Sequence, residues 1–257
     1  PMSILTYQNW WDQLSQSFDV VAVDLPNHGG SDAARDVTTV SQHAVFLGKI
    51  LNHFGLSHPH AVGPDIGTPT LMRFMADNPG RIRSATVGDA GAVGKVEGAL
   101  LFRGLVYSRL VQWGTLSAGG AIGGRIYCAA ANGIGYRLST PTPEAKADYL
   151  AGSTRFAKLR GQVGFLGSYP TETPALARDV TGIEAPVQVL HGEFDTFVSV
   201  TNSRRLADLL PNSRFAIIPG AAHYAWEDNP AEYLDKVLTF IDDVEATAGP
   251  AAQISGL

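Results

Sequence analysis

Residues 60–67 read His-Ala-Val-Gly-Pro-Asp-Ile-Gly and decide the fold, because a short apolar run passes through a glycine-flanked turn directly into a helical pattern. The same succession of strand and helix recurs along the chain. Apolar runs predict further strands at 20–25, 83–87, 187–190 and 215–218, and helical spacing predicts helices at 7–17, 38–54, 71–77, 203–210 and 231–242. This alternation predicts an α/β fold, with a mostly parallel sheet flanked by helices.

The regular alternation is interrupted once. Residues 92–184 contain glycine-rich and helical segments but no clear strand, and they lie between two predicted sheet strands. We therefore expect core parts at residues 1–91 and 185–257, with a helical cap inserted at 92–184. The first elements resemble the middle of a sheet, so we also expect N-terminal strands to be missing from this sequence.

Composition narrows the possible functions. The 257 residues are 45% hydrophobic and 17% charged, so they can form a sizeable core. The net charge of -5 includes no long run of one sign, which argues against nucleic acid and anionic membranes as partners. Cys128 is the single cysteine of the chain, so it has no second cysteine with which to form a disulfide or share a zinc ion. We expect a cytoplasmic protein with a small-molecule substrate, and a homodimer is one possible assembly.

The turn after the 60–64 run carries the candidate reactive group. Gly63-Pro64-Asp65-Ile66-Gly67 has the spacing of a G-x-Ser-x-G nucleophile turn, with aspartate in place of serine. A carboxylate attacks saturated carbon and leaves an alkyl ester, whereas a serine needs a base and attacks a carbonyl. Asp65 is the predicted nucleophile; its alternative role is to cap the helix that follows.

These motifs resemble the aspartate-nucleophile branch of the α/β-hydrolase superfamily, which contains epoxide hydrolases and haloalkane dehalogenases. Residues 24–32 (DLPNHGGSD) are similar to the D-x-P-G-H-G-x-S-D loop of that branch, although Asn27 replaces its usual glycine. The resemblance extends over most of the chain outside the cap. It implies the α/β-hydrolase fold.

The resemblance also implies a base and an acid. His223 follows the last predicted strand, where the family places the histidine that activates water. Asp195 lies in a segment like the family's G-x-x-D, where the acid that orients the base is found. Asp89 is a competitor, because some dehalogenase-like members carry this acid after the preceding strand.

Donors to the substrate are harder to assign. The family implies the backbone N–H of Ile66 as one oxyanion donor, and a second donor just before a proline that resembles Pro1. For the epoxide oxygen we choose Tyr169, with Trp113 as a second cap donor and Tyr107 as its alternative. The other cap tyrosines are Tyr127, Tyr136 and Tyr149.

The sequence favours an epoxide hydrolase acting on a bulky apolar epoxide, without metal or cofactor. A carbon–halogen hydrolase and a non-catalytic ligand-binding protein are the alternatives. Haloalkane dehalogenases often carry tryptophan directly after the nucleophile, and Ile66 occupies that position here. Fold alone does not separate these functions.

Overall fold

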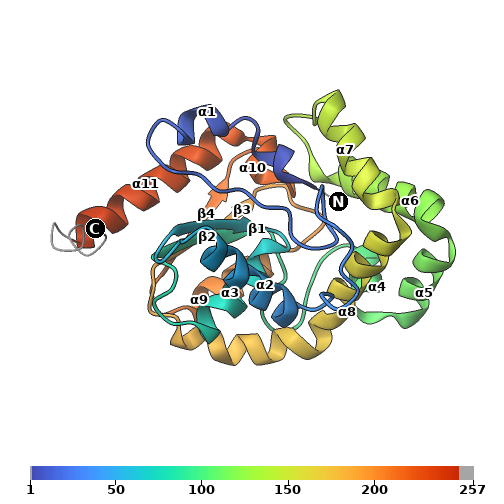
Figure 1. Ribbon diagram of the computed structural model, residues 1–257, viewed down its shortest axis with the longest axis horizontal. Helices are drawn as coiled ribbons and strands as arrows, with labels where there is room; N and C mark the ends of the chain where they lie inside the picture. Colours follow the sequence, from blue (N-terminus) through green and yellow to red (C-terminus); the bar gives the residue numbers. More distant parts are fainter. Residues whose placement is uncertain (1, 249–257) are drawn as a thin grey trace.

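The computed structural model describes residues 2–248 and is built around a four-stranded parallel sheet (Figure 1). Its strands lie side by side in chain order: β1 (His60–Pro64), β2 (Ser84–Gly88), β3 (Val187–Gly192) and β4 (Ser213–Ile218). The register pairs Pro64 with Gly88, Gly88 with Leu190, and Gly192 with Ile218. The carboxyl ends of all four strands therefore meet at one edge of the sheet.

Helices cover both faces of this sheet, as the alternation predicts (Figure 1). On one face lie α2 (Val40–His53), α3 (Gly67–Asp77) and α9 (Val200–Leu209), which share an apolar core with β1 to β3. The other face is covered by α1 (Trp11–Leu14), α10 (Ala225–Asp228) and α11 (Pro230–Ala248). A 3-10 turn, η1 (Ile4–Tyr7), precedes α1.

Two predictions near the N-terminus are wrong. Residues 20–25 are not a strand, because no ladder of hydrogen bonds joins them to the sheet that residues 2–248 form. An apolar, β-branched run becomes a strand only where a neighbouring backbone pairs with it. Likewise, the helix expected at 7–17 is divided between η1 and the four-residue α1.

Between β2 and β3 the chain forms five consecutive helices, which we call the cap. They are α4 (Leu100–Tyr107), α5 (Arg109–Ser117), α6 (Gly119–Gly135), α7 (Pro143–Thr154) and α8 (Phe156–Asp179), followed by the short η2 (Val180–Gly182). The long helix α8 belongs to both parts, since Leu176 packs in the sheet core and Val163 packs among the cap residues. The exact boundaries 92 and 184 stay a prediction.

Within residues 2–248, every helix is too short or too polar to cross a bilayer.

The cap is fastened to the loop that follows residues 20–25. Lys158 donates to the carbonyl of Gly29 at 2.6 Å, and Gln162 donates to the carbonyl of Asn27 at 2.8 Å. Asn27 has φ 71°, a left-handed conformation that asparagine tolerates better than most residues, which explains why it can replace glycine here. Its side-chain amide also donates to the carbonyl of Val37 at 2.7 Å, so the loop is held from both sides.

The contact between the β3 end and the loop after β4 leaves no room for a side chain. A Cβ atom built on Gly192 would lie 2.0 Å from the carbonyl oxygen of Ala222. We predict that Gly192→Ala lowers the free energy of unfolding by about 1–3 kcal/mol, measured by urea denaturation. Gly133→Ala is the control, because a Cβ there meets no atom within 4 Å, and it should leave stability unchanged or slightly raised. Equal midpoints for the two variants would contradict the prediction.

Candidate active site

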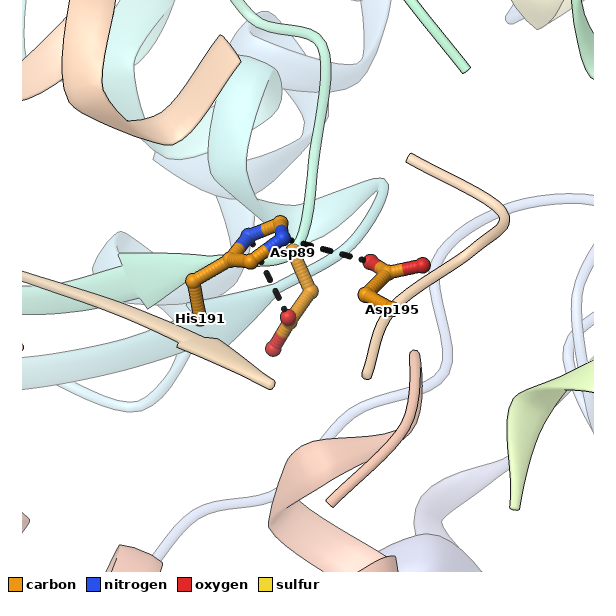
Figure 2. A group of neighbouring side chains, drawn as sticks. All are labelled: Asp89, His191 and Asp195. Carbon is orange, nitrogen blue, oxygen red and sulfur yellow. Dashed lines mark ion pairs between the residues drawn. The ribbon is translucent and has the colours of Figure 1, made fainter. Parts of the chain in front are cut away.

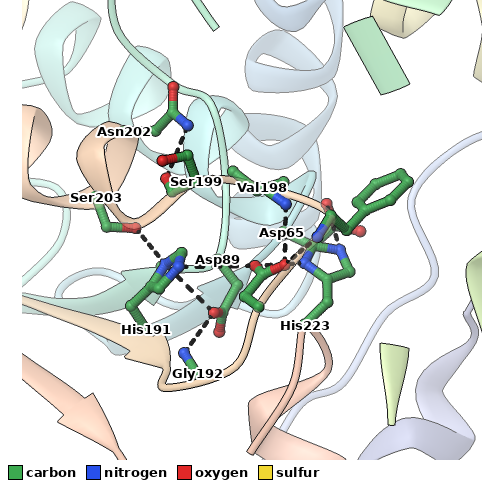
Figure 3. Close-up of polar contacts among 12 residues, drawn as sticks. Asp65, Asp89, His191, Gly192, Val198, Ser199, Asn202, Ser203 and His223 are labelled. Carbon is green, nitrogen blue, oxygen red and sulfur yellow. Dashed lines mark hydrogen bonds and ion pairs between the residues drawn. The ribbon is translucent and has the colours of Figure 1, made fainter. Parts of the chain in front are cut away.

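Each of the four strands is followed by one of the candidate catalytic residues: the nucleophile, the two candidate acids and the base. Asp65 follows β1, Asp89 follows β2, Asp195 lies in the loop after β3, and His223 lies in the loop after β4. Parallel pairing places all four loops at the same edge, which is where open α/β sheets bind ligands. Figure 3 shows Asp65, Asp89 and His223 gathered there.

Asp65 sits on a strained turn between β1 and α3. Its φ is 50°, a value that L-residues other than Asn and Asp seldom adopt, and its N–H donates to the carbonyl of Gly88 at 3.0 Å. The hydroxyl of Thr68 donates to Gly63 and accepts from the N–H of Gly88, both at 2.9 Å. These bonds hold the turn in place, and the Asp65 side chain keeps 25% of its surface exposed.

The two glycines that flank this turn are not equivalent. A Cβ on Gly63 would lie 3.2 Å from the carbonyl oxygen of Gly67, so Gly63 is needed for the close approach of strand and helix. A Cβ on Gly67 would meet no atom within 4 Å. The close approach of strand and helix therefore requires glycine at position 63 but not at position 67.

His223 hydrogen-bonds to Asp195 and faces Asp65. Its Nδ1 lies 2.9 Å from Oδ2 of Asp195, and its Nε2 lies 3.8 Å from Oδ1 of Asp65 (Figure 3). The second oxygen of Asp195 accepts from the amides of Phe197 and Val198 at 2.7 and 2.9 Å. Asp195 is therefore fixed by its own loop and orients the imidazole, with Nε2 toward the nucleophile.

Burial and charge act in opposite directions on His223. Burial disfavours its charged form, but the hydrogen-bonded Asp195 carboxylate, together with the Asp65 charge, outweighs burial and raises the pKa of His223 to about 9. Burial also raises the pKa of Asp65, and the charge of His223 opposes that shift. The two groups thus favour each other's charged forms.

Asp89 lies behind this pair and contacts a different histidine. Its Oδ1 accepts from the Gly192 amide at 2.8 Å and lies 3.5 Å from Nδ1 of His191 (Figure 2). Burial and the nearby Asp195 charge raise the pKa of Asp89 well above its usual value, whereas burial lowers the pKa of His191 to about 4. Both shifts favour uncharged side chains, and the geometry gives Asp195 rather than Asp89 the contact with His223.

Asp89, His191 and Asp195 are also the one set of possible metal ligands that converges in residues 2–248, with one ligand atom from each lying within 4.8 Å of the others. Asp195, however, already binds His223 and two backbone amides. Metal coordination would compete with those bonds, so the expectation of a metal-free site stays a prediction.

The cap contributes two tyrosines near Asp65. Tyr169 on α8, our choice from the sequence, is buried; burial and the Asp65 charge raise its pKa. The same two causes raise the pKa of Tyr127 on α6. Within residues 2–248, neither hydroxyl has a hydrogen-bond partner, which leaves both available to a substrate. Tyr127 was among the candidate tyrosines, but nothing in its spacing distinguished it.

The choice of Trp113 as second donor is wrong. Its side chain is 68% exposed on the outer side of α5, because the inner side of that helix carries Val111 and Leu116. The alternative, Tyr107, uses its hydroxyl to accept from the Val96 amide at 2.6 Å. Neither is placed to hold a substrate at Asp65.

Of the two expected oxyanion donors, Ile66 lies in the described part of the chain. Its backbone N–H bonds the Asp65 carboxyl and lowers the pKa of that group against the larger effect of burial. Pro1 lies outside the described residues.

Sequence reasoning also missed the residue that joins the cap to the loop carrying His223. The buried carboxylate of Asp228 accepts from the amides of Arg137, Leu138 and Ser139 at 2.8–2.9 Å and from that of Ala222 at 2.7 Å. An aspartate near a helix end gives no sequence signal of such distant partners. Asp228 thereby fixes the backbone next to His223.

Comparison with known proteins identifies the family of this chain. A family model for the alpha/beta hydrolase fold matches residues 2–230. The chain belongs to the α/β-hydrolase family. An uncharacterized protein of Mycobacterium tuberculosis is 27% identical over 259 residues, covering 95% of this chain and 74% of that protein. The 2-hydroxy-6-oxononadienedioate/2-hydroxy-6-oxononatrienedioate hydrolase of Paraburkholderia phymatum is 25% identical over 246 residues, with coverage of 91% and 80%.

Solved structures of this family share the fold at low sequence identity. The epoxide hydrolase CorEH (TM-score 0.75) and the ancestral haloalkane dehalogenase AncHLD2 (TM-score 0.75) are each 18% identical to this chain. They cover 95% and 96% of it, and the match spans 89% of each of them. An esterase from Thermogutta terrifontis superposes at a TM-score of 0.78 and is also 18% identical. The match covers 95% of this chain and 87% of the esterase chain. Likeness to all three shows the α/β-hydrolase fold alone.

The raised pKa of His223 gives the stability of this α/β-hydrolase a defined pH dependence. Because the folded-state pKa of about 9 exceeds the usual 6.5, protonation of His223 stabilises the folded protein. We predict that this contribution is fully present below pH 6.5 and is lost as pH rises through 9. Imidazole NMR should show one histidine signal that titrates near pH 9. This signal should be absent in His223→Gln and should titrate well below pH 9 in Asp195→Asn. An unshifted midpoint in Asp195→Asn would refute the assigned cause.

Proposed function

We propose that this α/β-hydrolase is an epoxide hydrolase in which Asp65 attacks the substrate. The supporting observation is the placement of a carboxylate, and not a hydroxyl, on the strained turn that faces His223. The two unpartnered tyrosine hydroxyls, Tyr127 and Tyr169, lie in the cap within the electrostatic reach of that carboxylate. This combination suits a substrate that needs a nucleophile at carbon and a proton donor at oxygen.

In the first step a carboxylate oxygen of Asp65 forms a bond to a ring carbon, and the carbon–oxygen bond of the epoxide breaks. The oxygen that leaves takes a proton from Tyr127 or Tyr169. A phenol is suited to this because it donates a hydrogen bond to the epoxide first and a proton to the alkoxide as charge develops. The product of this step is an ester of Asp65.

Formation of the ester lowers the pKa of the base, His223, and removes the charge of the nucleophile, Asp65. The Asp65 carboxylate is one of the charges that raise the pKa of His223, and alkylation removes that charge. His223 then loses its proton more readily, and this proton replaces the one given up by the tyrosine. Ester formation therefore favours the neutral His223 that hydrolysis of the ester requires.

In the second step His223 takes a proton from water, and the resulting hydroxide attacks the carboxyl carbon of Asp65. A separation of 3.8 Å between Nε2 and Oδ1 is too long for a direct hydrogen bond, but it allows a water bound to Nε2 to approach that carbon. The Ile66 amide stabilises the oxyanion, and the ester bond breaks. The leaving alkoxide takes the proton that remains on the added hydroxyl group, which gives the diol. Asp65 returns as a carboxylate and His223 as a cation, so protons balance over the cycle.

Removing the base should trap the ester. We predict that His223→Gln lowers turnover of an aryl epoxide at least about 100-fold while Asp65 still becomes alkylated. Intact-protein and peptide mass spectrometry should then find an adduct on Asp65 equal to the whole mass of the epoxide. Asp65→Asn/His223→Gln is the matched control and should form none.

The same experiment separates the alternatives. An adduct formed from an alkyl halide, equal to the halide minus hydrogen halide, with none from epoxides, would make the protein a carbon–halogen hydrolase. Tight binding of a panel compound without an adduct or turnover would favour a binding protein.

The tyrosines should matter for ring opening. We predict that Tyr127→Phe and Tyr169→Phe each slow the single-turnover alkylation of Asp65 by about 100-fold, because each removes a donor from the epoxide oxygen. Rapid-quench mass spectrometry of the ester measures this rate. Trp113→Phe is the control, because its exposed indole cannot assist, and its rate should equal that of the unmodified protein. An equal loss in all three variants would count against the assigned donors.

A further inference from the structure

The cap differs in charge from the rest of the chain. Residues 98–143 contain no aspartate, glutamate or lysine and four arginines, Arg103, Arg109, Arg125 and Arg137, whereas the whole chain has a net charge of -5. Among the ion pairs formed within residues 2–248, none involves Arg103, Arg109 or Arg125. An acidic protein therefore carries a locally basic surface over α4 to α6.

Helix α6 buries mainly small residues and leaves two large apolar residues exposed, whereas its large residues Tyr127 and Ile134 are partly buried. Its buried positions are Gly120, Gly123, Gly124, Cys128, Ala131 and Gly135. Ile122 and Ile126 point outward and are 62% and 61% exposed. A helix that faces water normally has the opposite arrangement, with its large apolar side chains in the core.

Close backbone contact explains why the inner side of α6 must be small. A Cβ on Gly124 would lie 2.1 Å from the carbonyl oxygen of Ser153, and one on Gly120 would lie 2.2 Å from that of Thr154. Small residues that let helix backbones meet are typical of helices packed within lipid. Here they fasten α6 to α7, so that only the outer side of α6 is free for contact.

Helix α5 extends the same surface. It packs on α6 so closely that a Cβ on Gly123 would lie 2.4 Å from the carbonyl oxygen of Thr115. Its outer side carries Leu110, 76% exposed, and Trp113, with Arg109 next to them. We call Leu110, Trp113, Ile122 and Ile126, with Arg109 and Arg125, the outer cap face; α5 and α6 form the end of the molecule opposite the far end of α11 (Figure 1).

We propose that the outer cap face docks on an anionic lipid surface. The charge of the whole chain argues against an anionic membrane as partner, but residues 98–143 contain arginines and no acidic residue, so this part of the surface differs from the rest. Exposed leucine, isoleucine and tryptophan side chains gain free energy by entering the boundary between headgroups and acyl chains, and arginines beside them attract acidic headgroups. A symmetric contact between two copies would bring Arg109 and Arg125 of one copy against the same positive surface of the other. An anionic lipid surface offers acyl chains to the exposed apolar side chains and negatively charged headgroups to the arginines. This inference does not depend on the proposed reaction.

Vesicle co-sedimentation tests the proposal. The protein should bind vesicles of phosphatidylcholine with about 30% phosphatidylserine, and bind pure phosphatidylcholine more weakly. Ile122→Ser/Ile126→Ser should weaken the partition coefficient about tenfold, and Arg109→Gln/Arg125→Gln should remove the preference for phosphatidylserine.

Matched controls come from exposed residues on other surfaces. Val45→Ser/Phe54→Ser and Arg35→Gln/Lys49→Gln replace the same kinds of side chain outside the cap and should bind vesicles as the unmodified protein does. Absence of binding to the acidic vesicles, or equal losses in the control variants, would overturn the proposal. So would a dimer in sedimentation velocity that Ile122→Ser/Ile126→Ser dissociates, because the face would then belong to a second copy.

Discussion

Parallel pairing of four neighbouring strands is the constraint on which the rest of the structure depends. Strands that run in one direction end at one edge, so the chain returns to the same place after β1, β2, β3 and β4. Asp65, Asp89, Asp195 and His223 gather there because each follows one of these ends. Three carboxyl groups and two imidazoles in a largely buried space cannot all be charged. The structure resolves this by giving Asp195 two backbone amides and His223, while Asp89 and His191 are held toward their neutral forms.

Local sequence patterns were informative wherever the local backbone determines the structure. The strands at 60–64, 83–87, 187–190 and 215–218 and the helix at 38–54 lie close to where periodicity predicts them. The turn after the first of these strands indicated Asp65, and the family resemblance indicated Asp195 and His223 in the loops after two later strands. Their proximity then required only the topology of the sheet.

Predictions failed where a distant partner decides the outcome. The apolar run at 20–25 has the composition of a strand, but composition does not provide the neighbouring backbone. Trp113 and Tyr127 are both aromatic residues of the cap, and only the packing of α5 and α6 turns one outward and the other toward Asp65. Asp228 is the clearest case, because its amide partners in the cap are about ninety residues away. Contacts between residues so far apart in the chain leave no periodic pattern in the sequence.

The ties between cap and core limit how molecules can enter and leave. Lys158 and Gln162 attach one side of the cap to the loop at 27–29, and Asp228 attaches the other side beside His223. A hinge motion of the whole cap would have to break both attachments at once and leave buried polar groups without partners. Passage must instead follow rotation of individual side chains, which takes picoseconds to nanoseconds when they are exposed, whereas hinge closure takes microseconds to milliseconds. Because the cap is held in place at both attachments, the size of a molecule rather than the rate of a lid determines its admission.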